Sequence, residues 1–399
     1  MPRELDRSDL RPAGPLGRRR FLAAGIEASL GLTFPASWMA CGGRPSERPD
    51  PIAAASAAGP GRQILVAIAV GVTAPSPHNT QPWRFRILDD LAMALHVDPE
   101  RVLPATDPPF RQVHLGHGTF LEHLDLGARE LGYAAEIRPF PQGELDPERI
   151  GERPVARVTL VADPGVRRDP LYAAIPRRIT NRAVYDAVPV PEADCERLLA
   201  SAGLRAARPG RTTDPARLRE LGDLLVRAFE IETSTPRTHA ETGRWFRFGD
   251  DEIARTGDGL SLAGNGTSGL RRWVAETFVL SRKSWPSERT RKAAVDAFRD
   301  QVRSARALVW LTTPRNTPHD WLDAGRDYAR LNLAATASGL AIHPMSQALQ
   351  EYPEMQQVRA ALHAALGAGP GETVQMLARL GHSAYRYASP RRPVTSMVI

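Results

Sequence analysis

A short segment, residues 74–85, carries side chains that could hold a planar ligand rich in heteroatoms. It follows the apolar run 64–70, which is too short to cross a bilayer and long enough for a buried helix. Prolines end that helix and keep the backbone extended. Trp83 offers an aromatic wall, so a rigid backbone, polar groups and an aromatic ring occur together. An ordinary turn between a helix and a strand has a similar composition, and this alternative stays open. The polar side chains are those of Ser76, Asn79, Thr80 and Gln81.

Two basic elements could bind a phosphate group. The first is an R-x-T-x-R pattern of Arg178, Thr180 and Arg182, which we expect at the start of a helix. Two arginines four residues apart share a helix face, and a helix N-terminus favours anions. The second is the segment S-P-R-R-P at 389–393, which contains Arg391 and is made rigid by its prolines. A solvated basic turn and a surface tail are the alternatives.

Three histidines raise the question of a metal site. His114 and His117 lie three residues apart on an expected helix, with His123 nearby. No carboxylate completes a ligand set with the first two, so packed or solvated roles are favoured. The sequence has no G-x-S-x-G and no phosphate-binding G-x-x-x-x-G-K-[ST] pattern, so typical hydrolase and P-loop signatures are absent.

The composition is that of a globular protein with a sizeable core. The chain has 399 residues, 42% of them hydrophobic and 24% charged. A net charge of +7 suggests a nucleic-acid partner, but only Lys283 and Lys292 are lysines and the arginines are spread along the chain. No basic stripe with interleaved aromatics occurs, so we expect no nucleic-acid partner. Two cysteines, Cys41 and Cys195, exclude a disulfide-dense scaffold.

The first 43 residues have the pattern of a bacterial targeting signal. The segment 17–22, G-R-R-R-F-L, fits the twin-arginine pattern and precedes a moderately apolar stretch that is too short to span a membrane. We therefore expect export to the periplasm or cell envelope, with a disordered basic tail as the alternative. Cys41 after Ala40 resembles a lipoprotein cleavage site, which suggests a lipid anchor. Residues 44–60, rich in Pro, Ser, Ala and Gly, are expected to form a linker.

Two parts of the folded region have the same order of elements. Strands are expected within 84–97, a helix over 111–133, and strands near 134–140 and 155–162. Five residues recur at a single offset of 207, which indicates an internal duplication, with chance similarity between Ala/Leu-rich helices as the alternative. We expect halves at 61–170 and 171–399. The recurring pairs are Gly118/Gly325, Leu124/Leu331, Leu126/Leu333, Ala128/Ala335 and Gly132/Gly339.

The middle of the second half contains additional helices. An amphipathic helix is expected over 214–232, followed by helices at 271–280 and 288–303. Between them, residues 234–272 are rich in Gly, Thr and Arg and are too long for an ordinary connection. We expect this segment to be a lid or a disordered excursion.

These motifs together resemble the nitroreductase family of FMN-dependent enzymes with an α+β fold. The stretch A-P-S-x-H-N-T-Q-P-W resembles the family's flavin-contacting motif, and R-x-T-x-R and S-P-R-R-P resemble its phosphate-binding motifs. Residues 339–346, G-L-A-I-H-P-M-S, resemble the loop beside the flavin edge. The arrangement resembles the Acg-like branch, in which two nitroreductase halves are fused into one chain. This resemblance implies a pseudo-dimer within a monomer.

The resemblance also implies which residues bind FMN. Each motif occurs in only one half, so one composite site per chain is expected. Chemistry would take place on the flavin without a catalytic side chain. In the position of Pro77 the family often has a small hydroxyl residue. Ser76, Asn79 and Gln81 would contact the ring or ribityl chain, Arg178, Thr180, Arg182 and Arg391 the phosphate, and Pro344, Met345 and Ser346 the ring, where a backbone N–H could reach N5.

The resemblance suggests three alternative functions. The first is an oxidoreductase in which FMN accepts hydride from NAD(P)H and passes electrons to a nitro, quinone or related acceptor. The second is a closed FMN-binding or flavin-storage protein with little turnover, in which residues 234–272 cover the flavin. A flavin-assisted biosynthetic or dehalogenating enzyme is a third interpretation.

Overall fold

The computed structural model describes residues 50–53, 63–144 and 146–399. They belong to one of the two units of the chain, Phe34–Ile399, and the other unit, Met1–Thr33, lies outside the described residues. The predicted leader, Cys41 and most of the predicted linker also lie outside them, so these expectations stay predictions.

The first half of the chain forms a four-stranded antiparallel sheet. Its strands are β1 (Trp83–Ile87), β2 (Ala92–Val97), β3 (Tyr133–Pro139) and β4 (Ala156–Ala162), in the order β1-β2-β4-β3. Two helices accompany it: α2 (Gln63–Gly71), apolar and buried from its second residue onward, and α3 (Arg111–Glu130), buried over most of its length. Because α2 is apolar on every side, it is covered by protein on every side.

The second half repeats this topology. Its strands are β5 (Arg208–Thr212), β6 (Ala307–Thr313), β7 (Ala341–Pro344) and β8 (Thr373–Gly381), in the order β5-β6-β8-β7 with antiparallel pairing throughout. Helices α4 (Glu192–Ala202) and α10 (Pro318–Ala337) accompany it. A capping box of Thr317 and Asp320, with Pro318 in the first turn, fixes the start of α10. The predicted α+β arrangement in two halves is confirmed.

The halves differ in one connection. A short turn joins β1 to β2, whereas residues 213–306 join β5 to β6. The predicted helices of this excursion are confirmed, and the segment 234–272, predicted to be a lid or disordered, lies within it and contains two further helices. Its role as a lid stays a prediction. The excursion contains α5 (Pro215–Ser234), α6 (Pro236–Trp245), α7 (Asp250–Thr256), α8 (Gly269–Val274), a π-helical turn (Ala275–Val279) and α9 (Glu288–Arg303).

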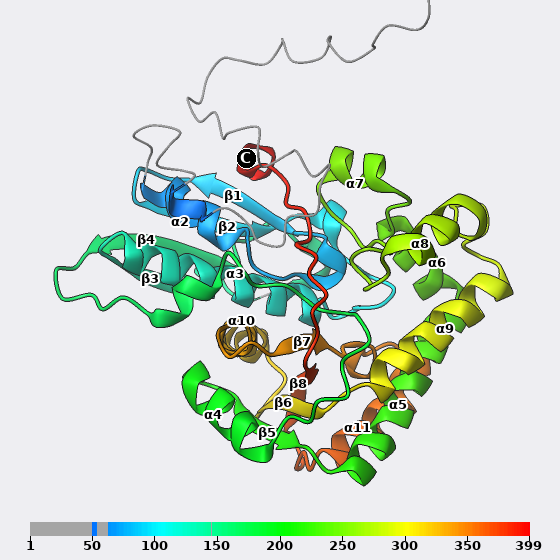
Figure 1. Cartoon of the computed structure of the whole chain (residues 1–399). Coiled ribbons are helices and arrows are strands. Elements are labelled where there is room, and N and C mark those ends of the chain that lie inside the picture. Colours follow the sequence, from blue (N-terminus) through cyan, green and yellow to red (C-terminus); the bar gives the residue numbers. More distant parts are fainter. Residues whose placement is uncertain (1–49, 54–62, 145) are drawn as a thin grey trace, which may run out of the picture. The chain divides into compact units, whose positions relative to one another are not determined.

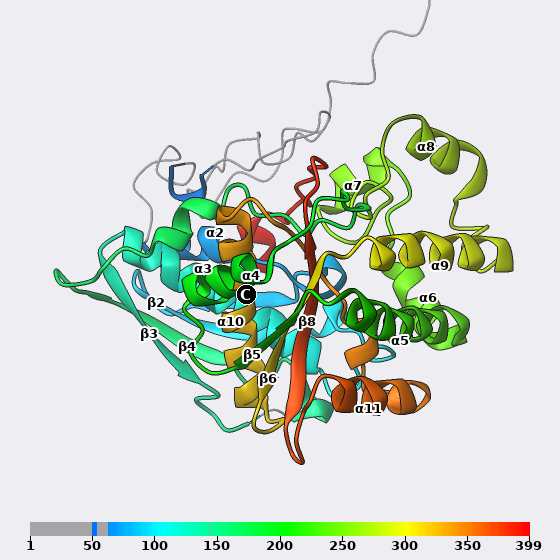
Figure 2. The ribbon, with the colours of Figure 1, turned by 60° about the horizontal axis from the view of Figure 1, so that its bottom comes forward.

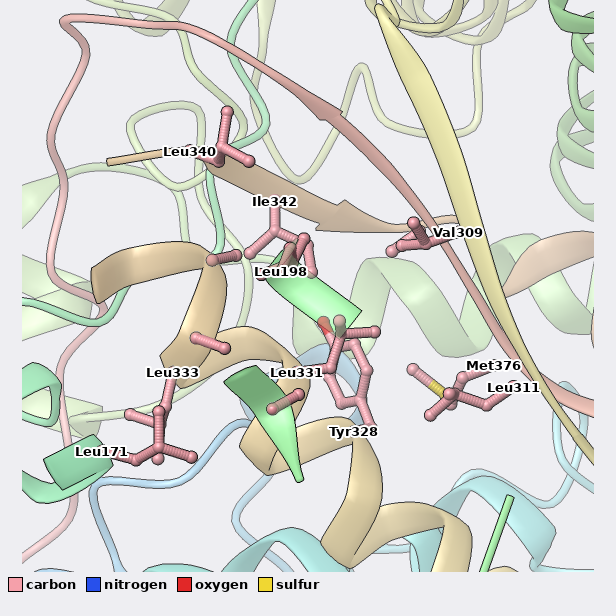
Figure 3. Close-up of a cluster of buried hydrophobic side chains, with 14 of the residues drawn as sticks. Leu171, Leu198, Val309, Leu311, Tyr328, Leu331, Leu333, Leu340, Ile342 and Met376 are labelled. Carbon is pink, nitrogen blue, oxygen red and sulfur yellow. The ribbon is translucent and has the colours of Figure 1, made fainter. Parts of the chain in front are cut away.

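Two apolar clusters support the second half. One lies between α4, α10 and the inner strands, where Tyr328 of α10 stands among leucine side chains (Figure 3). The other joins α5 and α9 to α11 (Gln356–Ala365), which lie near one another in Figure 2. The second cluster also contains Leu308, Val374 and Leu377 of the sheet, so burying the apolar faces of α5 and α9 fixes the excursion against the sheet.

The two halves contact each other along α3 and α10, which pack together between the sheets (Figure 1). The C-terminal segment adds a second contact. The N–H of Ile399 donates to the carbonyl oxygen of Phe85 at 2.9 Å, which places the last residues of the second half beside β1. Within the described residues, no helix has the length and apolar character needed to cross a bilayer.

Candidate functional site

The segment after α2 adopts an unusual backbone that fixes its side chains. His78, Asn79 and Gln81 have φ values of 46°, 54° and 52°, a left-handed region that residues other than glycine rarely adopt. Such conformations cost of order 1 kcal/mol each and persist where surrounding contacts impose them. Here the Ser76 hydroxyl accepts from the Gln81 N–H at 3.0 Å, and the Gln81 side chain donates to the carbonyl of Gly257 at 2.9 Å.

The R-x-T-x-R segment is extended, so the prediction that it begins a helix is wrong. Residues 178–182 follow a short 3-10 helix, Pro170–Ala174, and belong to no helix, although the Arg178 N–H donates back to the carbonyl of Ile175 at 3.3 Å. Instead the Asn181 N–H donates to the carbonyl of Ile342 at 3.0 Å, so the segment runs beside β7. Thr180 and Arg182 line one cavity, whereas Arg178 is buried and donates to the carbonyl of Thr73 at 3.2 Å.

A cavity lies where these segments meet, and we call it the central cavity. Its volume is about 110 Å³, and it is partly open to solvent. Five predicted site residues line it: Ser76 from the first half, and Thr180, Arg182, Pro344 and Ser346 from the second. Both halves therefore contribute, as the order of the motifs predicted. Its wall is completed by Pro75, Pro77, His78, Arg111, Gln112, Leu115, Gly116, Thr119, Tyr328, His343, Gln347, Gln350, Gln375 and Met376.

The charged groups of the central cavity are cationic. Arg111 and Arg182 line it, and no described carboxylate does. Arg111 is committed to the protein, because it forms an ion pair with Glu351 at 2.7 Å and donates to the carbonyls of Gln375 and Leu349. Arg182 forms no ion pair within the described part of the chain, and its hydrogen bond to the carbonyl of Gly264 is long at 3.4 Å. Arg182 is therefore the cation best able to meet an anionic ligand.

Two histidines beside Arg182 are neutral. Arg379 donates through Nε to Nδ1 of His343 at 3.0 Å, and a guanidinium has no acceptor, so the ring proton of His343 lies on Nε2. Burial, together with Arg379 and Arg182, holds the pKa of His343 well below its ordinary value. Burial and Arg182 lower the pKa of His78 to about 4. At neutral pH both rings therefore act as uncharged hydrogen-bonding groups.

Several buried polar atoms on this wall have no partner. Within the described residues, Nδ1 of His78 and the side-chain oxygens of Gln347 and Gln350 form no hydrogen bond. Leaving such atoms unpaired costs about 1–3 kcal/mol each, so three of them around one cavity suit a polar ligand. The donor set fits FMN, because a cation, a hydroxyl and amides match a phosphate and the polar edge of a flavin.

Four other predicted site residues lie away from the cavity wall. Arg391 donates to the carbonyls of Val72, Thr73 and Ala74, at 2.7 to 2.9 Å, and so caps the end of α2. Its Nη1 also donates to Oδ1 of Asn79 at 2.9 Å. The other three residues also have protein partners. Arg178 donates to the carbonyl of Thr73, and the Asn79 amide donates to the carbonyl of Pro390. The Gln81 side-chain oxygen accepts from the Arg392 N–H.

Met345 and Trp83 are core residues. Met345 is buried, and its N–H donates to the carbonyl of Leu377 at 2.7 Å, so this N–H is already paired. Trp83 is fully buried and packs on Phe120 with ring centroids 5.3 Å apart. The expectation that Trp83 forms an aromatic wall for a ligand is wrong. The apolar side chain instead anchors β1 on α3.

Sequence reasoning missed several residues of the cavity. His78 belongs to the segment 74–85, and its backbone is left-handed. In this conformation it lines the central cavity together with Arg182. His343 lies within the predicted loop 339–346 and Gln347 directly follows it, whereas no local sequence pattern marks Tyr328. The pattern G-x-G-x-x-G also occurs, at residues 264–269, but it follows no strand and so lacks the setting of a dinucleotide-binding loop.

The three histidines of α3 have structural partners. His114 and His117 donate through Nδ1 to the carbonyls of Phe110 and Val113, at 2.7 and 2.8 Å. His123 contacts Thr73 through Nδ1 at 2.8 Å. Burial lowers the pKa of His114 to about 3 and that of His117 to about 4, so these rings are neutral packing groups.

Comparisons with known proteins agree with this architecture. No family model matches the chain. A Mycobacterium tuberculosis H37Rv protein named "Putative NAD(P)H nitroreductase Rv3131" is 28% identical over 355 residues, covering 84% of this chain and 90% of that protein. The same organism's "Putative NAD(P)H nitroreductase acg" is 41% identical over 78 residues, 20% of this chain and 23% of that protein.

Solved nitroreductases resemble part of the chain. The FMN- and NADPH-dependent nitroreductase NfnB from Sphigopyxis sp. strain HMH matches 57% of this chain and 97% of its own, with 17% identity and a TM-score of 0.37. The FMN-dependent NfnB from Mycobacterium smegmatis, solved with NADPH, matches 55% and 92%, with 19% identity and a TM-score of 0.35.

The fold defines an α+β protein in which two similar halves enclose a cavity at their junction. Relatives named as nitroreductases, one of which covers most of the chain, confirm the predicted resemblance to the nitroreductase family and its Acg-like branch.

Proposed function

We propose that the protein is an FMN-dependent oxidoreductase that takes hydride from NAD(P)H and reduces an organic acceptor. The relatives named as nitroreductases and the solved FMN enzymes support this class. A nitro compound, a quinone or a related acceptor remains the proposed substrate. The observation that carries the proposal is the central cavity, where both halves supply polar groups around an arginine without a carboxylate partner.

Different residues of the cavity would bind different parts of the cofactor. Arg182 and Thr180 would hold the phosphate by charge and hydroxyl hydrogen bonds. His78, Gln347 and Gln350 offer unpaired polar atoms for the ring and ribityl groups, and Ser76 and Ser346 add short hydroxyl groups at the same wall. Bound FMN would supply two-electron redox chemistry, which no side chain of this cavity provides. Neutral His78 and His343 would orient ligands without adding charge.

We propose one such site per chain. The position related to Gly116 by the offset of 207 is Asp323, and the position related to Thr119 is Arg326. Arg326 forms ion pairs with Glu122 at 2.8 Å and Asp125 at 3.1 Å. Gly116 and Thr119 line the cavity, whereas their counterparts in the second half are a carboxylate, Asp323, and an ion-paired arginine, Arg326. At that second position the carboxylate would repel a flavin phosphate, and the paired arginine would not be free to bind it.

Three further proposals rest on the sequence patterns. The shared strand order of the two sheets supports an origin by internal duplication. The twin-arginine pattern supports export to the periplasm or envelope, with a lipid anchor at Cys41. Two fused halves support a monomer that acts as a pseudo-dimer. Mass spectrometry of the mature N-terminus and sedimentation of the holoprotein test these proposals.

Flavin absorbance provides the direct test of function. Apoprotein titrated with FMN is expected to bind one equivalent, and NADPH or NADH under nitrogen is expected to bleach the visible band. Addition of a nitroaromatic or a quinone should then restore the band. Bleaching by dithionite but by neither nicotinamide would instead favour the closed FMN-binding protein, and failure to bind FMN would overturn both functions.

A further inference from the structure

A second cavity lies within the helical excursion, and we call it the apolar chamber. Its volume is about 280 Å³, it is partly open to solvent, and α5, α6, α9 and residues 260–285 form most of its wall. Its lining is mainly aliphatic and aromatic: Phe229, Phe246, Leu260, Leu262, Ala275, Val279, Leu280, Trp285, Ala293, Ala294, Ala297 and Phe298.

Aromatic rings shape two sides of the chamber. Phe229 of α5 and Phe298 of α9 stack with ring centroids 4.3 Å apart. On α6, the His239 ring stacks on Trp285 at 5.1 Å, and the Trp285 indole N–H donates to the carbonyl of His239 at 3.1 Å. The Trp285 indole has its polar atom paired, so it offers its apolar surface to a ligand.

Small residues on α9 keep the chamber open. Ala293, Ala294 and Ala297 line it at helical spacing, between the larger Thr290 and Phe298. A larger side chain at any of these three positions would fill space that the alanine methyl groups leave free. The chamber therefore has apolar walls with room for a ligand, unlike the clusters of the core, where such faces are packed.

The chamber adjoins the central cavity. His78, Arg182, His343 and Gln347 line both. The tautomer of His343 is fixed by Arg379, so its other ring nitrogen carries a proton on the side away from Arg379. Apart from the Arg182 cation, which the proposed function assigns to the FMN phosphate, the polar end of a ligand in the chamber would thus meet neutral hydrogen-bonding groups where the two cavities join.

The chamber contains one described carboxyl group, Glu232, and it favours the neutral form. Glu232 is 2% exposed, and Gln350 donates to one of its oxygens at 2.9 Å. Burial raises the pKa of Glu232 to about 7, and Glu241 on α6 raises it further, whereas Gln350 and Thr242 lower it. A neutral ligand suits the apolar part of this wall better than an anion, because the aliphatic and aromatic side chains there offer no partner for a charge.

The outer wall of the chamber continues into exposed apolar side chains. Trp273 is 57% exposed and Phe278 is 71% exposed, on the same short stretch whose Ala275 and Val279 line the chamber. Residues 268–292 contain seven Arg or Lys and two Glu. Exposed apolar groups beside a cavity are typical of the entry of an apolar ligand.

We propose that the apolar chamber binds the electron acceptor, and that this acceptor is a neutral lipophilic molecule with a planar ring and an aliphatic chain. The ring lies at the junction near His78 and His343, and the chain lies along α9. The proposal rests on the proposed function for the role of the ligand, but the chamber binds such a molecule whether or not turnover occurs.

The test compares two probes by equilibrium dialysis with the FMN-loaded protein: 2-methyl-1,4-naphthoquinone, and the same ring carrying a saturated ten-carbon chain. Burying even two methylene groups strengthens binding about tenfold, so the alkylated probe is expected to bind at least about tenfold more tightly. Ala294→Trp fills the chamber and is expected to remove this difference. Ala361→Trp, on the exposed face of α11, makes the same change outside the chamber and should keep it.

Three outcomes are distinguishable. Equal affinity for the two probes in the wild-type protein overturns the proposal, as does a chain effect that survives Ala294→Trp. Should Ala294→Trp fail to fold, Ala297→Trp, at a more exposed chamber position, replaces it. If NAD(P)H fails to reduce the holoprotein while the ten-carbon chain of the probe still strengthens binding, the proposed function is wrong. The binding of a lipophilic ligand in the chamber is then still supported.

Discussion

Gly118 and Gly325 lie against each other where α3 and α10 cross. A Cβ atom on Gly118 would lie 2.1 Å from the carbonyl oxygen of Leu322 and 2.9 Å from Cα of Gly325. A Cβ atom on Gly325 would lie 2.1 Å from the carbonyl oxygen of Leu115 and 3.0 Å from Cα of Gly118. These two residues are also one of the pairs at the offset of 207, so equivalent glycines of the two halves meet at their junction.

Gly118→Ala should destabilise the protein by about 2 kcal/mol or more. The added methyl group meets backbone atoms, which cannot move aside as a flexible side chain would, and the helices must separate. Urea unfolding followed by circular dichroism measures the loss. Gly369→Ala is the matched control, because its Cβ atom would meet only Glu372 at 3.5 Å. Equal stability of the two variants would contradict the close approach.

Arg182→Gln should weaken FMN binding by about tenfold to a hundredfold. Hydrogen bonds to charged groups contribute about 1.5–3 kcal/mol, and Arg182 is the cavity cation without a described carboxylate partner. Quenching of FMN fluorescence during titration of apoprotein measures the affinity. Arg177→Gln removes the same charge from an exposed neighbouring residue and should leave the affinity unchanged. Similar losses in both variants would indicate a general effect of charge.

Asn79→Ala should loosen the C-terminal segment. The Asn79 amide accepts from Arg391 at 2.9 Å and donates to the carbonyl of Pro390 at 3.3 Å, and losing such bonds costs about 1–2 kcal/mol. Hydrogen exchange of residues 390–399 is expected to become about tenfold faster. Asn316→Ala, whose bonds run to Trp321 and Glu351, should leave exchange in this segment unchanged. Unchanged exchange in both variants would show that Asn79 does not hold the segment.

Glu232 should make the protein less stable as the pH rises from about 4.5 to about 7. Burial raises its pKa in the folded state to about 7 from 4.5, so over this interval the folded state binds the proton more tightly than the unfolded state does. The unfolding free energy therefore falls, by up to about 3 kcal/mol. In Glu232→Gln the decrease in unfolding free energy that Glu232 causes should disappear. Burial also raises the pKa of Asp107 to about 7, so the decrease that Asp107 causes should remain in this variant.

Urea unfolding at several pH values between 4 and 8 tests this dependence. Glu220→Gln changes an exposed glutamate of the same helix and should follow the wild-type pH profile. If Glu232→Gln also follows the wild-type profile, the buried carboxyl group does not account for the loss of stability.

The sequence by itself determined the elements and the two halves. Periodicity is local, so apolar spacing predicted α2, α3, α5 and α9, and strand-like runs predicted every strand except β5. The offset of 207 predicted that α3 corresponds to α10, and the first and last residues of the two helices differ by that offset. The same motifs predicted that Ser76 and Arg182, far apart in sequence, would belong to one site.

Only the tertiary structure decided how those motifs are used. Residues 178–182 are extended because pairing with Ile342, in a strand more than a hundred residues away, outweighs their local helical tendency. Arg391 caps α2 because the C-terminal segment returns to the first half. The apolar chamber depends on helices brought together from α5 to α9. These contacts join residues distant in sequence, so their geometry follows from packing and from no local pattern.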